Sequence, residues 1–484
     1  MLNTSAISVF RTFSKDELKK FEDFLNSPYY NKNSVVVNLF ALLKKHAPYY
    51  NSHDLERKKV WRRLYKNKDF NYGVMKNLIY DLGKCADNFI ELQNYEKDEK
   101  LRGIIVMKEK MNRNLNSSFE KSMKNYKNML ANLKLDFEYF YYEYSALKLQ
   151  REFTATMNKT NAEKTVEEEK EIEFLTLFYL NECADIYNTL LVNGSIMNKE
   201  YNSDNLELFL TLMKKFEHGY KEIIESSLLC LKLVLNKTDE SVYFKLKNIF
   251  FERSHNFSIP FNMSLGLTLR EHCGRKTAKG MKDYVKENFE VLLYTFENNF
   301  VTVDNNGFID PLSFTSLVSC ACRLNKIEWT EKFIYENIKK INPEYRDKFH
   351  NYSLVTLNVK KKNFNEALNY LAKMEVKNQM DHVSVKRFQL MIYYESGHTD
   401  ELYSLIEAFR NFISKNKKLS ESIKLPAGKF VYFVKKFSNI KFNYNSDNRF
   451  KIEELKDELV KTEVINKIWL LEKADELFML IVKS

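Results

Sequence analysis

Residues 354–371 read LVTLNVKKKNFNEALNYL, and this stretch decides the fold. Two runs of apolar residues are joined there by the polar corner KKKN at 360–363. The second run starts at Phe364 and continues through Ala367, Leu368 and Leu371 at helical spacing. The stretch therefore predicts two short helices that pack against each other as a pair.

Four columns of apolar residues recur around this pair at a spacing of 35 residues. Each column predicts a core position that is repeated in successive helix pairs. The columns are Cys320, Val355 and Leu390; Leu324, Val359 and Tyr394; Phe333, Leu368 and Tyr403; and Tyr335, Tyr370 and Leu405. This spacing predicts an array of stacked helix pairs over about residues 311–412.

Glycine and proline are scarce throughout the chain, with 11 and 6 residues in 484. Average usage would give roughly 34 and 24. Strand-rich folds need such residues at turns every 8 to 12 residues or so, whereas helices joined by short polar corners do not. We therefore predict an all-α fold. Because single cores stop growing at about 250–300 residues, we also expect two lobes or a quasi-linear helical array.

Four regions are predicted along the chain. Residues 1–110 form an N-terminal helical module, 111–200 a long helical hairpin broken at 157–161, 201–440 a helical-repeat array and 441–484 a C-terminal capping helix. Within the first region, Ser14 and Glu17 have the spacing of a capping box at the start of a helix. A dimerisation helix is the alternative for the last region.

The unit at 354–371 resembles the tetratricopeptide family, in which helix pairs repeat about every 34 residues. Ala367 and Leu371 match the family's A-x3-F spacing by size, while Lys332 and Leu402 replace the expected alanine in neighbouring units. Residues 18–33 (LKKFEDFLNSPYYNKN), 328–334 (EWTEKFI), 342–346 (NPEYR) and 469–473 (WLLEK) resemble an uncharacterised bacterial family with degenerate repeats of this type. The resemblances imply a TPR-like α-solenoid, and they imply no activity.

Basic residues outnumber acidic ones by 11, which suggests an acidic partner. A candidate basic patch on one predicted helix contains Lys58, Lys59, Arg62, Arg63 and Lys66. A second basic stretch runs from Lys415 to Lys441. These residues are interpreted as solvated helix faces, and phosphate binding is the alternative.

An aromatic cluster at 137–144 (FEYFYYEY) also has two interpretations. The rings could stack on bases of a nucleic acid. Aromatic residues on all sides of a helix more often indicate a helix that is buried on several sides. We therefore predict that this segment belongs to the core.

The sequence contains no complete catalytic, metal-binding or cofactor-binding motif. Residues 274–280 (GRKTAKG) lack the spacing and the preceding strand of a phosphate loop, and they are interpreted as a corner at the start of a helix. Residues 304–307 (DNNG) lack the first and twelfth ligands of a calcium loop, and they are interpreted as a turn. His272, Cys273, Cys320 and Cys322 do not have structural zinc spacing. No enzymatic activity, metal or cofactor is expected.

The start of the chain has no signal-peptide pattern, and no apolar stretch reaches the length of a membrane span. The six cysteines are scattered through apolar contexts, which is typical of reduced core residues. These features predict a cytoplasmic protein without membrane insertion.

Stacked helix pairs commonly present a concave surface to another protein. We therefore expect a non-enzymatic interaction scaffold or adaptor that binds a protein or peptide partner. Its groove is predicted to contain Arg323, Asn358 and Tyr393, which lie on the first helices and are separated by 35 residues. A nucleic-acid-associated regulatory protein that uses the basic helices is the alternative, and the sequence leaves the oligomeric state open.

Overall fold

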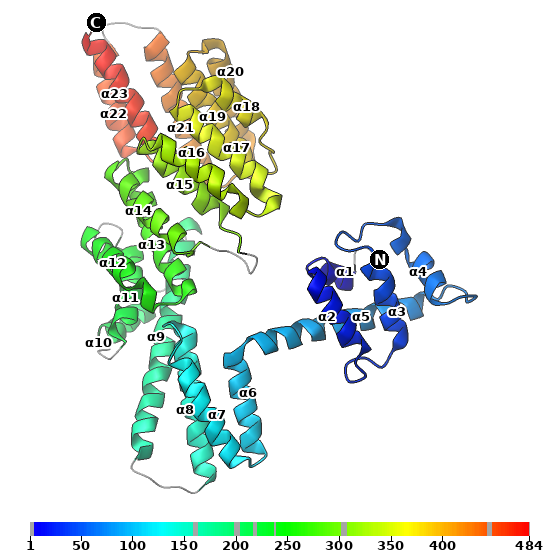
Figure 1. The fold of residues 1–484 in the computed structure, drawn as a ribbon. Helices are drawn as coiled ribbons and strands as arrows, with labels where there is room; N and C mark the ends of the chain where they lie inside the picture. Colours follow the sequence, from blue (N-terminus) through cyan, green and yellow to red (C-terminus); the bar gives the residue numbers. More distant parts are fainter. Residues whose placement is uncertain are drawn as a thin grey trace. The chain divides into compact units, whose positions relative to one another are not determined.

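The computed structural model describes residues 4–157, 163–197, 204–215, 220–236, 239–301, 307–442 and 448–483. Within these ranges the chain forms 23 α-helices and three short 3-10 helices (Figure 1). No β-strand is present among them, and a single isolated bridge pairs Leu135 with Phe257. The all-α prediction is confirmed.

The chain divides into two compact units. Unit 1 contains residues 1–132 and 142–169, and unit 2 contains residues 133–141 and 170–484. Helices α8 (Phe137–Thr156) and α9 (Glu163–Met197) contribute residues to both units. None of the helices in the described ranges is both long and apolar enough to cross a lipid bilayer.

Unit 1 begins with α1 (Ser5–Phe10), α2 (Lys15–Asn26), α3 (Ser34–Lys44), η1 (His53–Leu55), α4 (Arg57–Leu64), α5 (Tyr72–Lys97), α6 (Glu99–Asn112) and α7 (Asn116–Leu130). Its first core is built from phenylalanine rings. Phe21 is central to this core, because its ring lies 4.8 Å from the ring of Phe40 and 5.3 Å from that of Phe89.

The start of α2 has the predicted capping box. The Glu17 backbone N–H donates to the Ser14 hydroxyl at 3.1 Å, and the Ser14 backbone N–H donates to the Glu17 carboxylate at 2.8 Å. These bonds satisfy two backbone donors that the first turn of a helix would otherwise leave unpaired. The prediction from Ser14 and Glu17 is confirmed.

Unit 2 continues from α9 with a long succession of short helices. They are α10 (Asp204–Lys215), α11 (Lys221–Leu235), α12 (Glu240–Arg253), η2 (Ser254–Asn256), α13 (Ile259–Ala278), α14 (Asp283–Glu297), α15 (Pro311–Arg323), α16 (Ile327–Asn337), η3 (Ile338–Lys340), α17 (Pro343–Lys360), α18 (Phe364–Ala372), α19 (Gln379–Ser396), α20 (Thr399–Lys415), α21 (Glu421–Phe442), α22 (Asn448–Lys461) and α23 (Lys467–Lys483).

Neighbouring helices of unit 2 pack in a regular pattern. Consecutive helices contact each other from α11 to α21, and α15 also packs on α17 as α19 packs on α21. The column residues Cys320, Val355 and Leu390 are all buried in these contacts. Tyr335 does not fit its predicted core column, because it is 84% exposed. The helix-pair contacts fit a helical array.

Each of the pairs α15–α16, α17–α18 and α19–α20 turns at one residue with a positive φ. These residues are Asn325, Lys362 and Gly397, with φ values of 59°, 62° and 77°. In each corner the following backbone N–H donates to the carbonyl five residues earlier, at 2.9 to 3.1 Å. This bond is the mark of a left-handed cap that closes a helix C-terminus.

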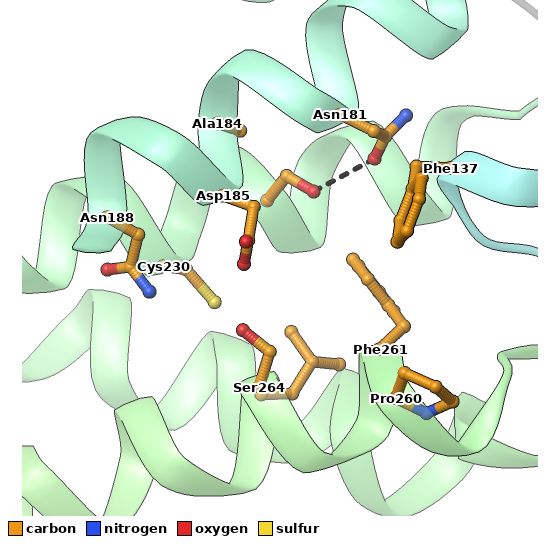
Figure 2. Close-up of a pocket in the computed structure, with 11 residues that line it drawn as sticks. Phe137, Asn181, Ala184, Asp185, Asn188, Cys230, Pro260, Phe261 and Ser264 are labelled. Atoms are coloured by element: carbon orange, nitrogen blue, oxygen red, sulfur yellow. Dashed lines mark hydrogen bonds between the residues drawn. The ribbon is translucent and has the colours of Figure 1, made fainter. Parts of the chain in front are cut away.

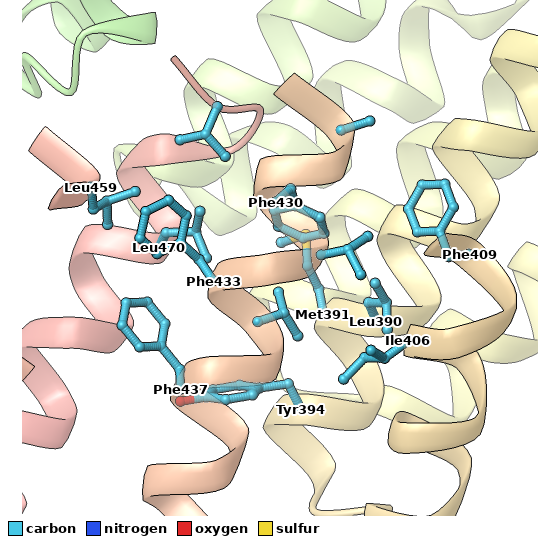
Figure 3. Packing of buried hydrophobic residues seen from close by; sticks show 14 of the residues in the cluster. Leu390, Met391, Tyr394, Ile406, Phe409, Phe430, Phe433, Phe437, Leu459 and Leu470 are labelled. Atoms are coloured by element: carbon cyan, nitrogen blue, oxygen red, sulfur yellow. The ribbon is translucent and has the colours of Figure 1, made fainter. Parts of the chain in front are cut away.

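The end of the chain packs on the last pair of the array (Figure 3). Three rings of α21, those of Phe430, Phe433 and Phe437, are at most 1% exposed. They share one core with Leu390 of α19, Phe409 of α20 and Leu470 of α23. Helix α21 therefore joins the array to α22 and α23.

Three local predictions differ from the structure. The first long stretch of the predicted hairpin is interrupted at 131–136, where backbone bonds tie Leu135 to Asn256 and Ser258. Two helices, α22 and α23, replace the single final helix, because the chain turns at Asn466 with a φ of 54°. Residues 274–278 are the last turns of α13 rather than a corner, and the turn comes at Gly280.

The aromatic segment 137–144 lies at the start of α8. Tyr139, Phe140 and Tyr142 are buried, as predicted for a core helix, whereas Phe137 and Tyr141 are exposed. Phe140 packs edge-on against Tyr220 at a centroid distance of 5.2 Å. Burial therefore accounts for three of the rings.

The corner residues predict opposite effects for two substitutions. Lys362→Gly is expected to raise the free energy of unfolding of unit 2 by about 0.5–1 kcal/mol, because glycine adopts a positive φ without the steric cost that a side chain incurs. Gly397→Ala is expected to lower it by about 1 kcal/mol. A Cβ at Gly397 would meet no atom within 4 Å, so the loss is a backbone effect. Differential scanning calorimetry checks both variants, and equal shifts would contradict the assignment.

Candidate protein-binding groove

A groove of about 300 Å³ lies in unit 2 between the first helices of three pairs and the C-terminal helix α23. Helices α15, α17 and α19 contribute one side, and α23 contributes the other. The lining residues are Ser319, Cys322, Arg323, Tyr352, Thr356, Val359, Lys360, Lys362, Phe364, Arg387, Phe388, Met391, Glu395, Asn466, Ile468, Trp469, Glu472, Lys473 and Glu476. The groove thus combines apolar walls with charged groups of both signs.

Arg387 ties α19 to its neighbours at the base of the groove. Its guanidinium donates to the Asn466 side-chain oxygen at 3.0 Å and to the Tyr352 hydroxyl at 3.1 Å. The same group lies 4.6 Å from the ring centroid of Phe388. Its Nε atom is buried and has no hydrogen-bond partner among the described residues.

A buried ion pair links α19 to α23. The Lys473 ammonium lies 2.6 Å from Glu395 and 2.8 Å from Glu476, and the Trp469 indole N–H donates to Glu395 at 3.0 Å. Burial alone would lower the pKa of Lys473, but the hydrogen bonds that its ammonium donates to Glu395 and Glu476 outweigh this effect and leave the pKa raised. The Lys473 ammonium therefore has two carboxylate partners, of which Glu395 is largely buried and Glu476 is 60% exposed.

The groove also has a cationic edge, formed by Arg323, Lys360 and Lys362, whose charges have no such partners within the described ranges. Arg323 and Lys360 stand at the C-terminal ends of α15 and α17, and Lys362 occupies the next corner. All three are exposed, and none forms a salt bridge within the described ranges. Because cations at a helix C-terminus also meet the negative end of the helix dipole, this edge is a stable place for positive charge.

The structure places only one of the three predicted groove residues in this groove. Arg323 lines it. Asn358 lines a separate hollow beside Tyr335 and Tyr370, and its amide donates to the Leu354 carbonyl. Tyr393 packs against the apolar clusters and does not line the groove.

The spacing between successive corner residues explains why Asn358 and Tyr393 do not line the groove. From Asn325 to Lys362 the array advances by 37 residues, and from Lys362 to Gly397 by 35. Counted from the corners, Arg323 corresponds to Lys360 and Glu395, and all three line the groove. A uniform spacing of 35 residues is therefore two residues short at the first step. Two residues turn an α-helix by about 200°, which points the side chain to the other face.

The sequence prediction did not include two rows of groove-lining residues in which successive members are four positions apart. Tyr352, Thr356 and Lys360 form one row on α17, and Arg387, Met391 and Glu395 form the equivalent row on α19. Residues spaced by four share one face of a helix. Polar or charged residues at this spacing on otherwise apolar helices could have indicated which side of each helix faces the groove. No comparable pattern in the sequence indicated that α23 lines the groove.

The candidate basic patch of unit 1 lies on and just beyond α4. Lys58, Arg62, Arg63 and Lys66 are exposed and Lys59 is half-buried, while Val60 and Trp61 point into the core. Arg63 forms a salt bridge with Asp54 at 3.5 Å. Lys66 lies after the end of the helix at Leu64.

Several lysines of the second basic stretch have internal partners. Lys435 donates to Glu407, and Lys424 donates to Glu421. The Lys441 ammonium donates to the Tyr394 carbonyl and lies 4.4 Å from the Tyr394 ring centroid. Lys415, Lys417, Lys418, Lys429 and Lys436 are exposed.

A separate network of titratable residues is buried between α12, α13 and α14. The Cys273 thiol donates to the Tyr243 hydroxyl, which donates to Glu287, and Lys247 donates to the same carboxylate at 2.6 Å. Burial raises the pKa of the Cys273 thiol to about 12. Such a thiol is neutral near pH 7 and is a poor nucleophile.

His272 lies beside this network and is completely buried. Its ring stacks on Tyr243 at a centroid distance of 4.9 Å, and neither ring nitrogen has a partner among the described residues. Burial, helped by the nearby cations Arg275 and Lys276, lowers the pKa of His272 to about 4. The ring is therefore neutral near pH 7.

Within the described ranges, no group of three or more His, Cys, Asp or Glu side chains is placed to hold a metal ion. Most of the predicted turn at 304–307 lies outside those ranges. The chain gives no match to a protein family model, to a curated protein or to a solved structure.

The buried ion pair predicts a large loss for Lys473→Met. Removing the ammonium takes away the cation that is paired with Glu395 and Glu476. Breaking a buried ion pair typically costs about 3–5 kcal/mol. We expect a decrease of about 3 kcal/mol in the unfolding free energy of the region around α19 and α23, measured by native-state amide hydrogen exchange.

Lys456→Met is the matched control. Lys456 and Asp475 join α22 to α23 at the same distance of 2.6 Å, but their side chains are 45% and 47% exposed. An exposed pair contributes less than about 1 kcal/mol. Losses of equal size in the two variants would contradict the role assigned to Lys473.

His272 predicts a loss of stability on acidification. Its pKa is lowered in the folded state, so the unfolded chain binds more protons between about pH 6.5 and pH 4. The contribution of neutral His272 to the free energy of unfolding is complete above pH 6.5. As the pH falls, the free energy of unfolding decreases by up to about 3 kcal/mol. Hydrogen exchange of the α13 amides should show this loss in the wild type and not in His272→Phe. A parallel decline in both proteins would assign the effect to other groups.

Proposed function

We propose that unit 2 contains a TPR-like helical array that acts as a protein–protein interaction scaffold, and that its groove holds one segment of a partner protein. The groove carries this proposal, together with its three exposed cations, which form no salt bridge within the described part of the chain. A segment that brings carboxylates to Arg323, Lys360 and Lys362 would supply the missing counter-charges.

The apolar part of the groove favours a segment with large hydrophobic side chains. Val359, Phe364 and Ile468 contribute apolar surface to the lining. Binding would remove this surface from water, at roughly 25 cal/mol for each Å² that is buried. A segment with apolar residues next to acidic ones therefore complements both parts of the groove.

A non-enzymatic role fits the ion pairs that Lys473 forms in the lining of the groove. Lys473, Glu395 and Glu476 are already joined to one another. A catalytic acid or base must be able to exchange a proton with a substrate, and a group held in a buried ion pair is poorly suited to that task. These residues are better suited to holding α23 against α19.

Cross-linking from inside the groove tests the proposal. A photoreactive amino acid at Thr356 of the full-length chain is expected to capture an acidic, apolar segment of a partner protein from a lysate of the native cells. Arg323→Ala with Lys360→Ala is expected to reduce the captured yield at least tenfold. Each lost charge-assisted hydrogen bond costs about 1.5–3 kcal/mol, and 1.4 kcal/mol is a factor of ten in affinity.

Two controls keep this result specific. Lys332→Ala with Lys339→Ala removes the same charge from exposed positions outside the groove and should leave the yield unchanged. The photoreactive group at exposed Asn369 on α18 should not capture the same segment. Capture that persists in the Arg323 and Lys360 variant would overturn the proposed groove.

A further inference from the structure

A second hollow of about 150 Å³ lies elsewhere in unit 2, between α9, α11, α13 and the start of α8 (Figure 2). A volume of this order holds a molecule of about the size of benzene. Its lining does not overlap with that of the groove described above. It is therefore a separate candidate site for a small ligand or a single side chain.

One end of this hollow is apolar and largely aromatic. Phe137 approaches from the start of α8, and Pro260, Phe261 and Leu265 approach from α13. In Figure 2 the rings of Phe137 and Phe261 lie together at this end. These side chains favour a hydrocarbon or aromatic group.

The other end presents hydrogen-bond acceptors. The carboxylate of Asp185 and the hydroxyl of Ser264 point toward the same open space (Figure 2). The side-chain oxygen of Asn188 is buried and has no hydrogen-bond partner among the described residues. The Asn188 amide nitrogen already faces the Thr268 hydroxyl, at 3.5 Å. In Figure 2 the amide nitrogen of Asn188 lies on the side of Cys230, and the oxygen lies on the far side.

The charge of the lining is negative. Asp185 is its only charged side chain near pH 7, and it forms no salt bridge within the described ranges. No Lys, Arg or His lines the hollow, and burial raises the pKa of the Cys230 thiol to about 12, so this thiol stays neutral. A cationic ligand is therefore favoured over a neutral or anionic one.

We propose that this hollow binds a primary ammonium group carried on a short apolar or aromatic stem. An ammonium offers three N–H donors and no acceptor. It matches the Asp185 carboxylate and the Ser264 hydroxyl, while the stem packs between Phe137 and Phe261. The proposal is independent of the protein-binding role of the groove.

Isothermal titration calorimetry of the full-length chain with 2-phenylethylammonium tests this site. Saturable binding is expected, with at least tenfold weaker binding of propylbenzene, which lacks the charge, and of 3-phenylpropionate, which reverses it. Asp185→Asn is expected to weaken 2-phenylethylammonium binding at least tenfold. Because Asp185 is exposed on α9, this variant is expected to fold.

Two further variants separate the hollow from general charge effects. Ser264→Leu fills the space and should abolish binding without changing the net charge. Glu182→Gln removes a carboxylate from α9 that does not line the hollow, and it should leave the affinity unchanged. A Glu182→Gln loss equal to that of Asp185→Asn would overturn the site.

The ammonium group could come from a free amine or from a lysine side chain of a polypeptide. Nα-acetyl-lysine methylamide therefore forms a second arm of the titration. Tighter binding of 2-phenylethylammonium identifies a small aromatic amine, and tighter binding of the lysine derivative identifies a polypeptide lysine. Failure of both compounds to bind, or equal binding of propylbenzene, refutes the proposal.

Discussion

The left-handed corner residue of each helix pair determines which side chains face the groove. Helices α15, α17 and α19 each end one or two residues before such a residue, and the hydrogen bond across the corner fixes where the helix stops. Every position on the first helix is therefore counted backwards from the corner. Arg323, Lys360 and Glu395 each precede their corner by two residues and share the groove for this reason.

Much of the fold follows from local features of the sequence. The scarcity of glycine and proline, the capping box at Ser14 and the apolar columns through Val355 required no knowledge of distant contacts. Each depends on residues within one or two turns of a helix, or on a repeat that many residues share. Such features are readable from one sequence because local chemistry determines them.

The groove could be predicted only in part, because its geometry depends on small shifts in register and on distant segments. A two-residue difference between corners moved Asn358 and Tyr393 away from it while leaving the buried columns hydrophobic. Helices α15 and α23 are far apart in the sequence, and no periodicity relates them. The interruption at 131–136 likewise depends on backbone bonds to residues 256 and 258.

The buried polar groups of unit 2 fall into two classes that have different consequences. Lys473 has carboxylate partners within the chain, so its interactions stabilise the folded state without a ligand. The Asn188 oxygen has no partner among the described residues, so the folded state leaves a desolvated acceptor that a donor could satisfy. Burial alone does not distinguish the classes, because both kinds of group are removed from water.

The two hollows of unit 2 also differ in the sign of their unbalanced charge. Arg323, Lys360 and Lys362 leave the groove with a cationic edge, whereas Asp185 leaves the smaller hollow with a negative charge. A single ligand with one dominant charge therefore cannot complement both. The groove attracts the proposed acidic segment and repels an ammonium ligand, and the smaller hollow does the reverse. Electrostatic attraction therefore directs each ligand to its own site before the ligand contacts the apolar walls.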